Sequence, residues 1–346
     1  MTPEQIEELG PAFADYLQPF LFCCDYTQTS HLLEVYCKGL LSDLPRKSAE
    51  PIALAAGTAV RTLQEFLKDH AWSHAAVRDA LQQHLAAALG ALPADDTGTV
   101  GVIDETATVK KGAKTPGVQR QWCGERGKAE NCVVTVHLAV ARGRYKALVD
   151  ADLFLPQSWG ADRDRCRAAG VPEEVGYRPK WRLALRQVCD ALAAGIALSW
   201  LTFDAAYGDK PGFLRGLDAL GVPYVGEVPR SLRCGGAPGA PLGLRLRVGF
   251  TRWNVEHALR LSKTEIGLRH FEGRSYTGLM RHLMLCLVTL AFVAGQAAGL
   301  RGEKPGGDGG AGVPGPELGV PGVAGGVAGD EPVAVHVRGH LLSPAA

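Results

Sequence analysis

Two aspartates, one glutamate and two basic residues of this 346-residue chain occur in contexts that suit chemistry on a phosphate backbone. Asp104 follows the apolar run in TVGVIDETA, and Asp204 follows the apolar run in IALSWLTFDAAYGD. Further along the chain, Glu256 lies between Arg252 and Lys263. Three carboxylates from separate elements can hold two Mg²⁺ ions about 3.5–4 Å apart, and cations beside them can bind phosphate. These five residues are therefore the candidate metal ligands and phosphate contacts.

The glutamate and the two cations are expected on one face of a helix. The segment RWNVEHALRLSKTEIGLRHFEGRSY contains no proline, which favours a helix over about residues 252–269. At 100° per residue, Arg252, Glu256 and Lys263 fall at about 0°, 40° and 20°, whereas Glu265 points to the opposite side. An ordinary surface helix with charge pairs four residues apart is the alternative interpretation.

The two aspartates are expected at the ends of β-strands. The run before Asp104 is rich in β-branched residues, and the run before Asp204 has the length of a strand and precedes a turn. A lone aspartate at a strand end more often caps a helix or forms a turn than binds a metal ion. Two such strands together with the helix of Glu256 favour the catalytic interpretation.

Four blocks of the chain resemble, in the same order, the catalytic blocks of a known family. They are IDETATVKKGAKTPGVQRQWCGERGKAENCVVTVHLAV (103–140), DADLFLPQSWGADRDRCRAAGVPEEV (150–175), LTFDAAYGDKPGFLRGLDALGVPYVGEVPR (201–230) and RWNVEHALRLSKTEIGLRHFEGRSYTGLMRH (252–282). The resemblance is to bacterial insertion-sequence transposases with a DDE superfamily endonuclease domain, in the branch that carries a Tyr-Arg-Glu-Lys signature. It covers roughly residues 10–295.

This resemblance implies an RNase H-like α/β fold, in which helices flank a mixed sheet whose first and fourth strands are neighbours. It assigns Asp104, Asp204 and Glu256 as the catalytic triad and metal ligands. Mg²⁺ or Mn²⁺ is the implied cofactor, with two ions expected when DNA is bound. Arg252 and Lys263 match the Arg and Lys of the signature.

The activity that the resemblance implies is metal-dependent DNA strand cleavage and strand transfer of an insertion sequence. The implied partner is double-stranded DNA, both as terminal inverted repeats and as target DNA. A homodimer on paired ends is one arrangement that this activity allows.

Two features depart from the family pattern. The Tyr of the signature would fall at Gly249, and Asp204 and Glu256 are only 52 positions apart, where the family usually carries a longer β-rich insertion. The intervening SLRCGGAPGAPLGLRLRVGF (231–250) is rich in Gly and Pro, and it has room for little more than one strand. The sequence therefore predicts a shortened insertion near residues 231–250.

The distribution of charge favours DNA as a partner, although the net charge is only +1. Basic residues gather in two stretches near the proposed triad, residues 109–128 and residues 230–282. Arg252 and Lys263 belong to the second stretch. In the first stretch, the predicted DNA contacts are Lys110, Lys111, Lys114 and Arg120. Solvated loops that carry Lys for solubility are the alternative for either stretch alone. Three aromatic residues in these stretches, Trp122, Trp253 and Tyr276, could stack on a base, although core packing is the commoner role for each.

The chain divides into three parts. Residues 1–95 are expected to form an all-helical N-terminal domain that could bind DNA ends, although no helix-turn-helix spacing is clear. Residues 96–300 are expected to form the α/β catalytic domain, with strands near 99–105, 131–140, 145–150, 197–203 and 223–228. Residues 301–346 are expected to be a disordered tail, because residues 302–332 contain twelve Gly and five Pro.

Composition favours a cytoplasmic enzyme that acts on the nucleoid. The nine cysteines are odd in number and include no C-x-x-C pair, which indicates reduced thiols. The N-terminus has no basic region followed by an apolar one, so no signal peptide is expected. The apolar run at 283–295 is shorter than the ~20 residues that a bilayer span needs, and we expect it to be a buried helix behind the sheet. No membrane association is expected.

Three functions remain open at this point. The first is an active DDE transposase. The second is a truncated relic that binds DNA without cutting it, which the shortened insertion and the unusual tail suggest. The third is a host nuclease with an RNase H-like fold, which is disfavoured because so many blocks match in order.

Overall fold

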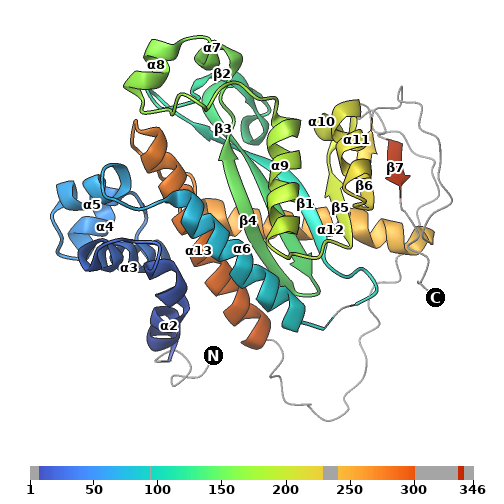
Figure 1. The fold of residues 1–346 in the computed structure, drawn as a ribbon, viewed down its shortest axis with the longest axis horizontal. Helices are drawn as coiled ribbons and strands as arrows, with labels where there is room; N and C mark the ends of the chain where they lie inside the picture. Colours follow the sequence, from blue (N-terminus) through green and yellow to red (C-terminus); the bar gives the residue numbers. More distant parts are fainter. Residues whose placement is uncertain (1–7, 94, 229–240, 301–333, 339–346) are drawn as a thin grey trace.

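The computed structural model describes residues 8–93, 95–228, 241–300 and 334–338 of the chain (Figure 1). The N-terminal part is helical, as predicted, with α2 (Leu9–Leu21), α3 (Thr27–Leu41), α4 (Ala49–Ala55), α5 (Val60–Lys68) and α6 (His74–Ala91). The remainder is a mixed sheet flanked by helices, which confirms the predicted α/β class.

The sheet is built from β1 (Val100–Val109), β2 (Gln119–Cys123), β3 (Lys128–Arg142), β4 (Tyr145–Leu153), β5 (Trp200–Phe203), β6 (Tyr224–Val228) and β7 (Ala334–Arg338). The helices that accompany it are η1 (Gly124–Arg126), α7 (Gln157–Gly160), α8 (Arg163–Ala168), α9 (Lys180–Ala193), α10 (Ala205–Gly208), α11 (Pro211–Ala219), α12 (Leu242–Thr264) and α13 (Tyr276–Leu300).

The strand order is β2-β3-β1-β5-β6-β7, and β4 pairs with the C-terminal half of β3. β1 runs antiparallel to β3 but parallel to β5, with Val102 opposite Thr202. The first and fourth of the five predicted strands are therefore parallel neighbours, as expected. β1 and β3 carry long runs of Val, Ile and Thr, which suit strands buried on both faces.

Helix α12 differs from its predicted extent. It begins at Leu242, ten residues earlier than expected, and ends at Thr264 before Gly267, whose φ of +84° a glycine adopts at little cost. Residues 242–250 are thus helical and not a strand, while residues 229–240 lie outside the described part of the chain. Val248, Val255 and Ser262 are fully buried at a spacing of seven, so this stripe explains why the segment is helical against the sheet.

Residues 334–338 form strand β7, although the composition of the tail predicts disorder throughout residues 301–346. This segment, AVHVR, contains neither Gly nor Pro, and it pairs antiparallel with β6. The pairing covers backbone groups that β6 would otherwise expose at the sheet edge. Residues 301–333 and 339–346 lie outside the described residues.

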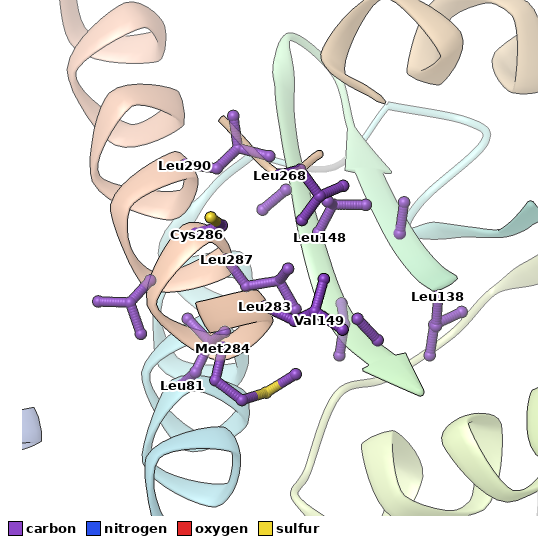
Figure 2. Packing of buried hydrophobic residues seen from close by; sticks show 14 of the residues in the cluster. Leu81, Leu138, Leu148, Val149, Leu268, Leu283, Met284, Cys286, Leu287 and Leu290 are labelled. Atoms are coloured by element: carbon purple, nitrogen blue, oxygen red, sulfur yellow. The ribbon is translucent and has the colours of Figure 1, made fainter. Parts of the chain in front are cut away.

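Helix α13 is the centre of the hydrophobic core (Figure 2). Leu283 and Leu287 point toward Leu148 and Val149 of β4, and α13 also packs against α3, α5 and α6. By length and composition Tyr276–Gly299 could cross a membrane, but 83% of its most apolar window is buried inside the protein. The apolar run at 283–295 is therefore a core helix, as predicted.

Polar contacts also join α13 to the N-terminal helices. The Tyr36 hydroxyl hydrogen-bonds His282 Nδ1 at 2.8 Å in a buried position. The Arg281 guanidinium lies 4.5 Å from the centre of the Trp72 ring and donates to the His70 carbonyl at 2.7 Å. Because these contacts join residues more than two hundred positions apart, the helical part and the sheet share one continuous core.

Replacing Leu287 with Ala should destabilise the protein by about 2–5 kcal/mol, because it removes a fully buried side chain and leaves a cavity between α13 and β4. Urea unfolding monitored by circular dichroism measures the change. Leu54→Ala is the matched control, because Leu54 is exposed, and its stability should stay within about 0.5 kcal/mol of wild type. Equal losses of stability in both variants would contradict the assignment of α13 as a core helix.

Candidate active site

The parallel pairing of β1 and β5 brings the two predicted aspartates side by side where β5 ends. The expectation that both end a strand is wrong for Asp104, because β1 continues to Val109 through its pairing with β3. Asp104 lies two residues beyond Val102, and Asp204 lies two residues beyond the paired Thr202. Asp204 directly follows β5, and its carboxylate accepts a hydrogen bond from the Ala206 backbone N–H at 3.0 Å. Asp204 therefore caps α10, which confirms the helix-cap interpretation for this residue, while its catalytic role stays a prediction.

Several nearby charges act on the carboxyl group of Asp104 and shift its pKa. Burial raises the pKa of its carboxyl group, while the backbone N–H of Glu105, at 2.8 Å, and the charges of Lys263 and Arg252 lower it. The negative charge of Asp204 raises it again. Asp204, Arg252 and Lys263 thus lie within electrostatic reach of Asp104.

Glu256 lies on α12 between Arg252 and Lys263, but its side chain is outside the described part of the structure. The described side chains include no group of three His, Cys, Asp or Glu residues that could hold a metal ion. They do include two of the three expected ligands. Both are carboxylates, an all-oxygen donor set that suits Mg²⁺ or Mn²⁺, and the partly desolvated Asp104 would gain from a neighbouring cation.

Glu105 points to the face of the sheet opposite Asp104, because successive residues of a strand alternate. Its carboxylate accepts hydrogen bonds from Lys180 Nζ at 2.5 Å and from the Tyr207 hydroxyl at 3.0 Å. These contacts join β1 to α9 and α10, so Glu105 positions the elements on either side of Asp204. Sequence reasoning did not assign this role, although the alternation along β1 was a usable signal.

His137 of β3 lies directly opposite Asp104 in the strand register, and it is fully buried. Its Nε2 lies 2.8 Å from Thr135 Oγ1, and that hydroxyl donates to the Thr106 carbonyl at 3.3 Å. The hydroxyl therefore accepts from His137, which places the imidazole proton on Nε2. Burial, followed by the charge of Lys263, lowers the pKa of His137 to about 3, so the ring is neutral at neutral pH.

The other ring nitrogen of His137, Nδ1, is buried and has no hydrogen-bond partner among the described side chains. The same holds for Thr106 Oγ1 on the same sheet face. Within the described part of the chain, these two atoms are therefore available to a further polar group. Sequence reasoning did not single out this residue, although a histidine inside the apolar run VVTVHLAV was a usable signal.

Arg252 is held by an acidic residue of the sheet. Its Nη1 lies 2.6 Å from Glu227 Oε1, and Glu227 belongs to β6. Both side chains are partly exposed, so the ion pair is open to competition from another anion. Glu227 was not among the predicted site residues, because its contact with α12 depends on how the helix crosses the sheet.

The other predicted DNA contacts lie beyond the end of β1. Lys110 Nζ donates to the Phe271 carbonyl at 2.5 Å, and burial lowers the pKa of this lysine. That contact joins β1 to the segment before α13, a structural role. Lys111, Lys114 and Arg120 are exposed. Of the aromatic candidates, Tyr276 is buried, Trp122 is exposed, and the side chain of Trp253 lies outside the described residues.

Comparisons with known proteins bear on the family of this chain. The family described as DDE superfamily endonuclease matches residues 19–236, which include Asp104 and Asp204 and end before α12. The chain is also similar to a probable transposase for insertion sequence element IS701 from Microchaete diplosiphon, with 28% identity over 190 residues. The similar region covers 54% of this chain and 46% of that relative, so this chain matches only about half the length of the relative.

Replacing Glu105 with Gln should lower stability by about 1–2 kcal/mol, because the partly buried Lys180 ammonium loses its ionised partner. Urea unfolding measures the loss. Glu173→Gln is the control, since it also removes one carboxylate from an ion pair but at a fully exposed position, and no measurable change is expected. If Glu105→Gln unfolds at the same urea concentration as wild type, the proposed positioning role is wrong.

Proposed function

Because the chain belongs to the DDE superfamily endonuclease family, we propose that it is an insertion-sequence transposase that cuts and joins DNA strands in a metal-dependent reaction. The observation that carries this proposal is the position of Asp104 in β1 beside Asp204, which directly follows the neighbouring parallel strand β5, with the charges of Arg252 and Lys263 of α12 acting on Asp104. A host nuclease would need the same chemistry, but the similarity to an insertion-sequence transposase favours transposition.

Asp104, Asp204 and Glu256 would hold the metal ions. When bound, such ions activate water or a terminal 3′-OH and stabilise the leaving oxygen of an in-line phosphoryl displacement. The Glu105 contacts with Lys180 and Tyr207 would keep β1 and α10 in place, and thereby keep the two aspartates apart by a fixed distance. His137 Nδ1 would offer a neutral acceptor beneath them.

Arg252 and Lys263 would bind the phosphate groups on either side of the scissile bond. The planar guanidinium can bind two phosphate oxygens at once, whereas the ammonium acts as a point charge. Lys111, Lys114 and Arg120 are exposed and would contact the backbone further along. The proposed substrate is double-stranded DNA in the nucleoid, as terminal inverted repeats and as target, with a homodimer on paired ends as the proposed assembly.

A second candidate function is DNA binding without cleavage. It is favoured by one observation: the family match ends at residue 236, before the helix that carries Glu256. The short segment between Asp204 and α12 agrees with that candidate. Cleavage assays separate the two candidates, because both predict DNA binding and only one predicts metal-dependent nicking.

Replacing Asp104 with Asn should lower metal-dependent nicking by more than about 100-fold. Loss of a group that only orients a metal ligand already lowers metal affinity or activity about 10–100-fold, so loss of the ligand itself should lower activity further. DNA affinity without metal should hold or rise, because the variant has one negative charge fewer. Gel assays with Mg²⁺ or Mn²⁺ measure nicking, and fluorescence anisotropy measures binding.

Glu256→Gln should behave like Asp104→Asn, whereas Glu265→Gln is the matched control on the same segment. Glu265 is exposed just beyond the end of α12, and it should keep wild-type nicking. Equal losses in the two glutamine variants would show that the third ligand is misassigned. A wild-type protein that binds DNA yet never nicks it would leave the binding-only candidate as the function.

Replacing Glu227 with Gln should raise DNA affinity about two- to fivefold at low salt. The partly exposed ion pair between Arg252 and Glu227 contributes about 0.2–1 kcal/mol. In the variant, DNA phosphate would no longer compete with the Glu227 carboxylate for Arg252. Glu34→Gln is the control, because it removes an equal charge from an ion pair with Lys38 on α3. A similar gain in both variants would show that only net charge matters.

A further inference from the structure

The hairpin formed by β2 and β3 presents an indole to solvent. Trp122 is 64% exposed, whereas Trp72, Trp159 and Trp200 are buried. Its cross-strand partner is Ala129, which is too small to cover the ring. Much of the indole surface is therefore accessible to a flat partner, and an aromatic face can stack on one.

Residues other than Trp122 hold the backbone of the hairpin in place. On the inward side of β2, Gln121 Nε2 donates to the Cys132 carbonyl at 2.8 Å, and Cys123 packs with Cys132 in a small buried cluster. The strand is also held at its start, where Trp159 Nε1 donates to the Val118 carbonyl at 2.8 Å. The indole is therefore displayed from a backbone that other residues fix.

The surroundings of Trp122 are positively charged. Arg120 shares its exposed strand face, and Arg126 and Lys128 are exposed at the turn of the hairpin. The two nearby acids are already paired, Glu125 with Arg269 at 2.5 Å and Glu130 with Lys128 at 3.2 Å.

The segment that carries Lys111 and Lys114 lies beside this hairpin. Asn131 Nδ2 donates to the carbonyls of Lys110, at 2.5 Å, and of Gly112, at 3.1 Å. The exposed ring thus lies among exposed cations contributed by two adjacent segments. A polyanion with flat apolar groups matches both properties, which is the chemistry of single-stranded nucleic acid.

We propose that Trp122 stacks on an unpaired base of the DNA substrate, with Arg120 on an adjacent phosphate. This inference rests on the proposed function. The base must be unpaired or terminal, because bases inside a duplex already stack on both faces. Eight residues of β3 separate Ala129, opposite Trp122, from His137, opposite Asp104, which is at most about 26 Å along the strand. The stacked base can therefore lie up to several nucleotides from the scissile phosphate.

The test compares full-length wild type with Trp122→Ala, Trp122→Phe and Arg120→Gln. The probes are a blunt duplex and a duplex of equal phosphate number with single-stranded tails that contain 2-aminopurine.

Trp122→Ala should bind the tailed probe about five- to one-hundred-fold more weakly, and the blunt duplex within about twofold of wild type. Trp122→Phe should restore most of the loss, and wild type but not Trp122→Ala should quench 2-aminopurine. Arg120→Gln should reduce the slope of log affinity against log salt by about 0.7 on the tail.

Phe22→Ala is the matched control, because Phe22 is 87% exposed at the end of α2 without this cluster of cations, and it should bind both probes like wild type. Unchanged binding of the tailed probe by Trp122→Ala would overturn the inference. So would a shift from dimer to monomer in that variant with unchanged DNA affinity, because the indole would then lie in a protein interface. Wild type that binds neither probe would overturn the proposed function as well, whereas wild type that binds both probes equally would overturn the stacking role alone.

Discussion

The backbone hydrogen bonds between β1 and β5 are the constraint on which the candidate site depends. They set Val102 opposite Thr202, and so place two aspartates one hundred residues apart in sequence side by side where β5 ends. A shift of β1 by one residue would exchange the faces of Asp104 and Glu105. Glu105 would then face α12, and its contact with Lys180 of α9 would be lost. The candidate site and the contact between Glu105 and Lys180 therefore require the same register.

Much of the fold could be predicted because the strands of the sheet and helix α13 are strongly apolar. Five strands and one core helix were identified from their own residues. The start of α12 was not, because LGLRLRVGF shows its buried stripe only when a sheet is known to lie beneath Val248 and Val255. β7 was missed for a related reason: five residues in a Gly-rich tail form a strand only where an edge such as β6 is available.

The candidate site also contains residues that could be predicted from sequence and residues that could not. The sequence predicts that Asp104 and Lys263 lie in one site, because their side chains can bind metal ions or phosphate. The structure shows that the charge of Lys263 acts on Asp104, while their catalytic roles stay predictions. Their supporting partners were not predicted, since His137 and Glu227 acquire a role only through strand register and helix placement. Lys110 shows the converse limit: its charge suggested a phosphate contact, yet its ammonium donates to a backbone carbonyl inside the fold.

The position of α13 has a consequence for biosynthesis. The N-terminal helices pack on a helix that is synthesised more than two hundred residues after them, through contacts such as Tyr36 with His282. A nascent chain that has emerged only as far as β6 holds both aspartates but lacks the helix that completes its core. Such a chain exposes apolar surface on its first helices until translation reaches about residue 300, so a prematurely terminated product would go to chaperones and proteases and would not persist as a partial DNA binder.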